Sequence, residues 1–369
     1  MQLTATKTNL VNTLSIAARV ASSSSAIQAA HGVLIDTEGT GVSISATDLN
    51  TSITLPLVTE AQEGAGRLLL PARLLLDIVK SCPAATVSIG VAADGQARIE
   101  SGAASFDLRT LILGDFPQLP QPDAATASTL PLAPFVAAID KVADSASRDE
   151  TRPVLTGINV RVAGSSLRAV ATDSYRLSVY RGTLETPAER DFHLTLPAPA
   201  LQELAKLAKV AGDQQLTISQ SGRNFVMQFA SITLTTRTID GQFPDPDALI
   251  PTDCDFSFSY PADTLAQTVK RISLLCQKNA PAVLTFNGIG LKCHAAAADV
   301  GSVEEILADV PHEGDPFTIG LNPDFLTAAL SHYTGGNVEM RLISPLRPVV
   351  LTDSSGSLWQ ILMPIRINT

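Results

Sequence analysis

The chain has 369 residues, of which 26 are Lys or Arg and 36 are Asp or Glu, so its formal net charge is −10. At roughly 150 residues per domain, this length predicts two or three domains, and the low charged fraction of 17% excludes a long disordered polyelectrolyte. No apolar run reaches the roughly 18 residues of a membrane-spanning helix. The first ten residues lack a basic and apolar secretory signal, so we expect a cytoplasmic protein. The acidic total by itself argues against nucleic acid as a partner.

Three segments share one pattern, which is a short apolar strand, a proline and then an amphipathic helix of about three turns. They are residues 67–83, 192–210 and 317–333. Their prolines, Pro71, Pro197 and Pro323, follow one another at intervals of 126 residues. We expect each proline near the first helical position, where its missing N–H would have no partner in any case.

The sequence around these segments repeats as well. A second helix is predicted upstream of each of them, over residues 7–20, 134–148 and 261–278. Alternating strands with glycine-bearing turns follow every helix, as in antiparallel hairpins. The chain therefore reads as three copies of a unit of about 125 residues. Each copy has two helices and about eight strands in an α+β arrangement, and the predicted domains are residues 1–122, 123–252 and 253–369.

Metal, redox and cofactor chemistry find little support in the sequence. No CxxC or HExxH motif is present, so we expect no metal and no cofactor, and we interpret the cysteines as reduced, buried or partly buried thiols. The pairs Asp245 and Asp247, and Asp253 and Asp255, are conceivable magnesium ligands, but both lie in proline-rich turn sequences, where aspartate commonly caps a turn. The four cysteines are Cys82, Cys254, Cys276 and Cys293.

Charge is distributed unevenly between the predicted helices and the rest of the chain. The six helices together carry +5, so everything else carries −15. Solvated helix faces are one interpretation, and a basic surface that contacts phosphates is the other. No helix-turn-helix or aromatic base-stacking motif is evident, so any such binding would not be base-specific. The cations on or beside these helices are Lys7, Arg19, Arg73, Lys80, Lys141, Arg148, Lys206, Lys209, Lys270, Arg271 and Lys278.

Several motifs of the chain also occur together, in this order, in one known family. They are Thr156-Gly157-Ile158, ATDSYRL from Ala171 to Leu177, Leu196-Pro197, Phe243-Pro244-Asp245, Asp299-Val300-Gly301 with Glu304-Glu305, FTIGLNP from Phe317 to Pro323, and Met363-Pro364-Ile365-Arg366. With the threefold repeat, they resemble the bacterial sliding clamp, the beta subunit of DNA polymerase III, over the whole length. The resemblance implies a DNA clamp fold of three repeated domains and a six-domain ring made by a head-to-tail homodimer. Such a ring is non-catalytic and encircles duplex DNA with its helices lining the hole.

The resemblance also implies a pocket between the second and third domains that binds short apolar peptides. Its expected partners are the polymerase III alpha subunit, the clamp loader, other polymerases and repair proteins. The matching positions are Leu155, Thr172, Ser174, Tyr175, Arg176, Leu177, Pro244, Leu249, Pro345, Ile361, Met363, Pro364 and Arg366. In the dimer interface, Phe106 and Leu108 of one chain should meet Leu274 and Leu275 of the other, with Glu304 and Glu305 nearby.

Some positions depart from the family pattern. Ser174-Tyr175 replaces the usual Gly-His, and two customary basic positions of the interface are Ala103 and Ser105, so apolar packing would have to close the ring. An accessory or antibiotic-resistance clamp with weakened loading is therefore an alternative. A second alternative is a hydrolase or transferase that uses Asp173, Tyr175 and Arg176.

Overall fold

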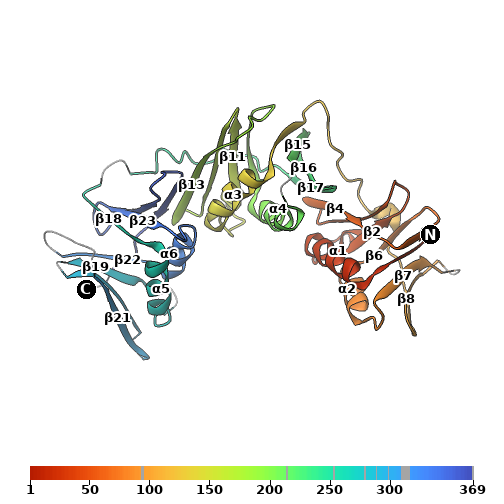
Figure 1. The fold of residues 1–369 in the computed structure, drawn as a ribbon, viewed down its shortest axis with the longest axis horizontal. Coiled ribbons are helices and arrows are strands. Elements are labelled where there is room, and N and C mark those ends of the chain that lie inside the picture. The colour runs from red at the N-terminus through yellow and green to blue at the C-terminus, as the bar shows by residue number, and fades with distance from the viewer. Residues whose placement is uncertain are drawn as a thin grey trace. The chain divides into compact units, whose positions relative to one another are not determined.

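The computed structural model describes residues 1–92, 95–212, 215–251, 254–277, 280–287, 289–297, 299–308 and 316–367. These residues form two compact units (Figure 1). Unit 1 comprises Met1–Leu132 and Lys206–Thr238, and unit 2 comprises Ala133–Ala205 and Ile239–Thr369. Within the described residues, no helix combines the length and the apolar character needed to span a bilayer.

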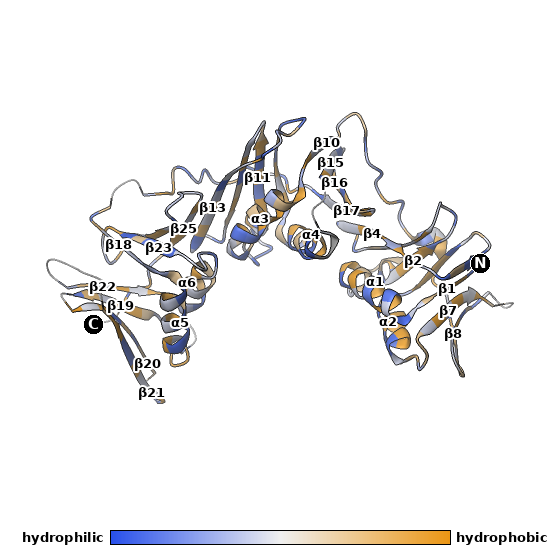
Figure 2. Cartoon of the chain, in the orientation of Figure 1, coloured by the Kyte–Doolittle hydropathy of each residue, from blue (hydrophilic) through white to orange (hydrophobic). Residues whose placement is uncertain are grey.

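All six predicted helices are present, which confirms the helix count of the repeat. Most carry hydrophilic and hydrophobic residues on different faces (Figure 2); on α2, for example, Leu75 and Val79 are buried whereas Arg73 is exposed. The helices are α1 Lys7–Val20, α2 Ala72–Ser81, α3 Leu132–Val142, α4 Ala198–Ala211, α5 Ala262–Ser273 and α6 Pro323–Leu330. Short 3₁₀ turns are η1 Gln28–His31, η2 Leu113–Asp115, η3 Ala143–Ser145 and η4 Pro153–Thr156.

The prediction that a proline lies near the first position of each downstream helix is confirmed. Pro323 is the first residue of α6, and the Asn322 side chain caps that helix by accepting from two backbone N–H groups. Pro71 and Pro197 instead end strands, and their helices begin one residue later. Pro71 has ψ 115°, which is extended rather than helical. Its fixed φ suits a strand end as well as a helix start.

Unit 1 contains two antiparallel sheets. The five-stranded sheet has the order β5-β1-β7-β8-β9, and the eight-stranded sheet has the order β10-β15-β16-β17-β4-β3-β2-β6. The strands are β1 Gln2–Thr6, β2 Gly32–Asp36, β3 Val42–Thr47, β4 Thr51–Leu57, β5 Ala61–Glu63, β6 Arg67–Pro71, β7 Thr86–Val91, β8 Ala97–Ser101, β9 Ala104–Leu108, β10 Ser128–Pro131, β15 Gln215–Ser221, β16 Asn224–Phe229 and β17 Ile232–Arg237.

Unit 2 repeats this plan. Its eight-stranded sheet has the order β14-β11-β12-β13-β25-β24-β23-β18, and its four-stranded sheet has the order β21-β20-β19-β22. The strands are β11 Gly157–Ala163, β12 Ser166–Thr172, β13 Arg176–Thr183, β14 Phe192–Pro197, β18 Phe256–Pro261, β19 Ala282–Asn287, β20 Gly290–Ala297, β21 Gly301–Leu307, β22 Phe317–Leu321, β23 Asn337–Leu342, β24 Val349–Thr352 and β25 Leu358–Leu362.

Each large sheet contains strands from two copies of the repeat. In unit 1, β4 of the first copy pairs with β17 of the second, with Ile53 opposite Leu234. In unit 2, β13 of the second copy pairs with β25 of the third, with Ser178 opposite Gln360. We call these pairings the first and second seams. Because the seams join copies, the two compact units do not coincide with the predicted domains, whose boundaries stay a prediction.

Two predicted helices are shorter than their apolar periodicity suggested. Residues 134–148 form α3 only as far as Val142 and then continue as the 3₁₀ turn η3. Residues 261–278 form α5 only as far as Ser273, and Leu274, which caps the helix, is 81% exposed. An exposed leucine at the end of a helix has nothing in its own chain to pack on, so it adds no helix-stabilising burial.

The third copy of the repeat offers a direct test of its aromatic core. Phe286 is fully buried on β19, and its ring centroid lies 4.9 Å from that of Phe258 and 5.2 Å from that of Phe256. We expect Phe286→Ala to lower the free energy of unfolding by roughly 3–5 kcal/mol, because it leaves a cavity where the ring was. Urea titration measures this change. Ile289→Ala, at a position that is 73% exposed, should change it by less than about 0.5 kcal/mol.

Candidate binding site at the second seam

A cavity of about 570 Å³ lies in unit 2 beside the second seam. Its floor is apolar, because Leu177 of β13 and Ile361 of β25 are cross-strand partners and each is only 4% exposed. Both pack in one cluster with Val170 and Val179, against Phe243 of the connecting segment. A floor made from two paired strands of a sheet is a rigid surface for an apolar ligand.

One wall of the cavity is a tight turn between β12 and β13. The Asp173 carboxylate accepts hydrogen bonds from the backbone N–H groups of Tyr175 and Arg176, both at 2.9 Å, and from Arg176 Nε at 3.0 Å. Thr172 Oγ1 donates to the Arg176 carbonyl at 2.7 Å. Asp173 therefore has three donors to hold the turn. This geometry assigns it a structural role and gives no support to the hydrolase or transferase alternative.

The turn directs Tyr175 outward. Ser174 has φ 77°, a left-handed conformation that favours glycine, and its hydroxyl accepts from Arg152 Nη1 at 2.9 Å. Tyr175 is consequently 64% exposed at the mouth of the cavity. Ser174 and Tyr175 thus place an anchored hydroxyl and an exposed phenol ring on this wall.

The rim of the cavity is unusually apolar for exposed surface. Leu346, Leu249 and Met363 are 65%, 49% and 44% exposed. Together with Tyr175 they form a contiguous apolar patch around one cavity, which is typical of a binding surface. Arg347 and Arg176 also line the cavity, so cationic groups flank the apolar floor.

The structure brings most of the sequence-predicted pocket residues together. Those that line the cavity are Thr172, Ser174, Tyr175, Arg176, Leu177, Pro244, Leu249, Ile361 and Met363. Leu155, Pro345, Pro364 and Arg366 are not among the lining residues. Leu346, Arg347 and Pro348 were missed. They follow Pro345 directly, so the prediction found the right loop but placed the lining residue one to three positions too early.

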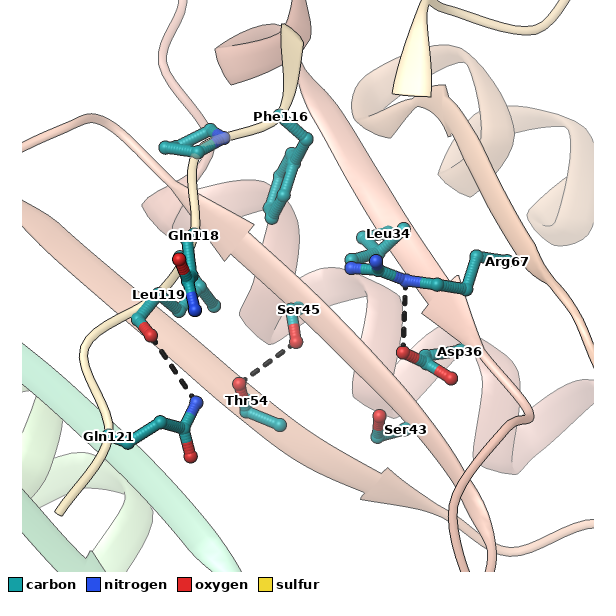
Figure 3. Close-up of a pocket in the computed structure, with 11 residues that line it drawn as sticks. Leu34, Asp36, Ser43, Ser45, Thr54, Arg67, Phe116, Gln118, Leu119 and Gln121 are labelled. Carbon is teal, nitrogen blue, oxygen red and sulfur yellow. Dashed lines mark hydrogen bonds and ion pairs between the residues drawn. The ribbon is translucent and has the colours of Figure 1, made fainter. Parts of the chain in front are cut away.

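A second cavity, of about 550 Å³, lies in unit 1 on the outer face of β2, β3 and β4 (Figure 3). Its lining combines apolar residues such as Leu34 and Phe116 with two polar pairs: Arg67 Nε lies 3.1 Å from Asp36 Oδ2, and Ser45 Oγ lies 2.9 Å from Thr54 Oγ1. The first seam differs from the second in side chains: where the second seam pairs Leu177 with Ile361, the first pairs Ser52 with Thr235. Neither Ser52 nor Thr235 is among the lining residues of this second cavity.

Some of the predicted DNA-facing cations contact distant parts of the chain. Lys7 Nζ donates to the Cys82 carbonyl at 2.7 Å, Lys141 Nζ donates to the His332 carbonyl, and Arg271 pairs with Glu305 at 2.5 Å. The contact of Lys141 with the His332 carbonyl connects two distant parts of unit 2, and burial lowers the pKa of this lysine. Lys278 lies outside the described residues. Exposed on the helices or just beyond them are Arg19, Arg73, Lys80, Arg148, Lys206, Lys209 and Lys270.

The predicted interface residues lie on two sheet edges. β9, with Phe106 and the nearly buried Leu108, ends the five-stranded sheet of unit 1, and β21, with Glu304 and Glu305, ends the four-stranded sheet of unit 2. Leu274 is exposed and Leu275 is half-buried at the end of α5. Both edges are unpaired among the strands that the structure describes.

The interpretation of all cysteines as at least partly buried thiols was wrong at one position, because Cys254 is exposed. Burial raises the pKa of Cys293 to about 12, so this thiol is inert as a nucleophile. Asp247, considered as a metal ligand, binds Arg168 at 3.0 Å and Arg181 at 2.6 Å. Asp253 lies outside the described residues, and no cluster of three or more His, Cys, Asp or Glu side chains suited to a metal occurs in the described part.

Family models of one known protein match the chain over almost its whole length. Residues 1–120, 129–245 and 247–366 match the N-terminal, central and C-terminal domains of the DNA polymerase III beta subunit. The beta sliding clamp of Streptomyces coelicolor is 31% identical over 352 residues, covering 91% of this chain and 92% of the relative. That of Bacillus subtilis is 28% identical over 378 residues, covering 99% and 100%.

Solved structures of sliding clamps have the same fold as this chain. The sliding clamp of Bacillus subtilis has a TM-score of 0.89 and 27% identity, with full coverage of both chains. A sliding clamp of Pseudomonas aeruginosa bound to griselimycin has the same TM-score and the same coverage at 24% identity, and so shares the fold. The chain therefore belongs to the family of bacterial beta sliding clamps, the beta subunits of DNA polymerase III.

Proposed function

We propose that this chain is a processivity clamp, a non-catalytic subunit that closes around duplex DNA in the cytoplasm and tethers the replicative polymerase. The observation that carries the proposal is the match to proteins named beta sliding clamp along all three repeats. The relatives do not favour the alternative of a specialised or resistance paralogue with weakened loading.

The cavity at the second seam is the docking site that we propose for partner peptides. Its apolar floor, exposed Met363 and cationic rim suit a short apolar segment with a polar or acidic flank. The polymerase III alpha subunit, the clamp loader and other polymerases and repair proteins would take turns in it. Griselimycin, found bound to the Pseudomonas aeruginosa clamp, is a ready probe for this chain.

Ring closure follows from the repeat. In both seams, the third strand after a copy's first helix pairs with the last strand of another copy: β4 with β17, and β13 with β25. Two strands in these positions have no such partner among the described strands. They are β21, the third strand after α5, and β9, the last strand of the first copy. A third seam between β21 of one chain and β9 of another satisfies both edges, and applying it twice closes a head-to-tail dimer.

The register of the third seam can be derived from the first two. Ile53 faces Leu234 in the first seam and Ser178 faces Gln360 in the second, on the side covered by the helices. Aligning the copies by these positions gives a pairing in which Val303 of one chain faces Phe106 of the other. This side would be closed by apolar contact, to which the exposed Leu274 can contribute.

The acidic groups on these edges are paired within their own chain. Asp107 accepts from Arg98 at 2.8 and 3.1 Å, and Glu304 lies 2.6 Å from Lys292. Glu305 accepts from Arg271 and Thr268, and the Arg271 hydrogen bond lowers its pKa. No carboxylate of this group needs a cation from a second chain, so closure rests on backbone hydrogen bonds and apolar contact.

The topological test decides the function. The clamp, loaded onto nicked circular duplex DNA by a clamp loader, should remain bound through gel filtration, because a closed ring cannot leave a circle. Cutting the circle once should release it, because the exposed cations contact phosphates without base specificity and allow sliding. Equal retention on circular and linear DNA would contradict encirclement.

The cavity is tested with the double variant Leu177→Ala, Met363→Ala, which removes apolar floor and rim together. We expect griselimycin affinity to fall by at least about tenfold, since two well-buried apolar contacts are lost. Isothermal calorimetry measures this change, and light scattering should still give the mass of a dimer. Ile112→Ala, at a position in unit 1 that is 71% exposed, is the control. Unaltered affinity in the double variant would refute the docking assignment.

The third seam predicts a dimer that responds weakly to salt. Light scattering should give two chain masses, and the dissociation constant should change by less than about threefold between 0.05 and 0.5 M NaCl, because the edge carboxylates are already paired in their own chain. Phe106→Asp should give monomers by placing a charge opposite Val303, whereas Val58→Asp, at an exposed position, should not. A steep loss of dimer with salt would show that ion pairs between chains dominate.

A further inference from the structure

Behind the cavity at the second seam lies a much smaller, polar chamber. It is enclosed by η3, β13, α6 and β25 and has a volume of about 10 Å³. A space of this size is about the smallest that holds one water molecule. Its polar wall is formed by Asp144, Ser145, Arg176, Ser178, His332 and Gln360.

Two polar atoms at this chamber are buried without a hydrogen-bond partner among the described residues: Gln360 Oε1 and His332 Nε2. Gln360 is only 3% exposed, and its Nε2 donates to Ser178 Oγ at 3.2 Å across the seam. His332 Nε2 lies 3.6 Å from Asp144 Oδ2, too far for a direct hydrogen bond. Exchanging the amide oxygen and nitrogen of Gln360 would still leave one polar atom unpartnered, so the need for a partner does not depend on that choice.

Arg176 connects the chamber with the larger cavity, because it lines both. Its guanidinium carbon lies 4.4 Å from the ring centroid of Phe325 on α6, and its Nε donates to Asp173 at 3.0 Å. One side chain thus forms part of the cavity wall on one side and of the polar chamber on the other. The occupant of the chamber therefore affects the position of the Arg176 side chain in the cavity wall.

We propose that the chamber holds one ordered water molecule shared by Gln360 and His332, and that this water fixes Arg176, so that Gln360 and His332 are positioning residues of the peptide cavity. The inference rests on the proposed peptide-binding function. A water has two hydrogens and two lone pairs, so it can donate to Gln360 Oε1, form a hydrogen bond with His332 Nε2 and accept from the guanidinium of Arg176. Filling the chamber in this way leaves no buried polar atom orphaned.

The inference is tested by high-resolution crystallography combined with griselimycin binding. The native protein should show one water peak within hydrogen-bonding distance of Gln360 and His332. Gln360→Met keeps the length of the side chain but removes its polar end, so the water should be lost and the affinity should fall at least about fivefold. Gln360→Glu keeps an oxygen at the same place and should retain both water and affinity. Gln228→Met, on β16 of unit 1, is the matched control and should bind as the native protein does.

The outcomes distinguish the inferred water site from the proposed docking function. A dry chamber in the native protein, or griselimycin affinity of Gln360→Met within about twofold of native, would overturn the inference while leaving the docking site intact. A native protein that fails to bind griselimycin would instead overturn the proposed docking function. If Gln360→Met does not fold, the water peak in the native crystal and the affinity of Gln360→Glu still decide.

Discussion

The pairing of strand edges between copies of the repeat is the constraint on which the rest of this structure depends. An edge strand of a sheet exposes backbone N–H and C=O groups that can pair with a further strand. The two seams inside the chain pair four such strands, β4 with β17 and β13 with β25. In the corresponding positions of the repeat, β21 and β9 still end their sheets, so assembly into a dimer would use the same interaction once more.

The seams also decide where a ligand can bind. A strand pair exposes one face to the helices and the other to solvent, and the outward residues are free to vary without disturbing the backbone ladder. At the second seam these residues are Leu177 and Ile361, with Met363 beyond the end of β25. The turn anchored by Asp173 then shapes the wall beside them. The cavity therefore combines an apolar strand pair of the seam with walls from the neighbouring turn and loops.

The periodicity and spacing of residues in the sequence predicted the helices and the repeat. They did not predict which partner each charged side chain contacts. The helix from Lys7 to Val20 follows from its own apolar pattern and agrees with α1 to the residue. The engagement of Lys141 could not be predicted, because its acceptor on His332 lies 191 residues away. Arg271 is neutralised by Glu305, 34 residues further on. Net charge on a helix thus overstates what remains for phosphates, since tertiary contacts consume part of it.

The same reasoning explains why one chain would have one apolar docking site although its ring would have three kinds of seam. In the first seam, the positions of Leu177 and Ile361 are taken by Ser52 and Thr235, which are buried and carry hydroxyls in place of large apolar side chains. In the third seam, the derived register places Ser302 and Asp107 at the positions of Leu177 and Ile361. The Asp107 carboxylate already binds Arg98. An apolar floor at the third seam would compete with closure by attracting peptides to the joint that must open and shut. Restricting it to the second seam separates partner binding from ring closure.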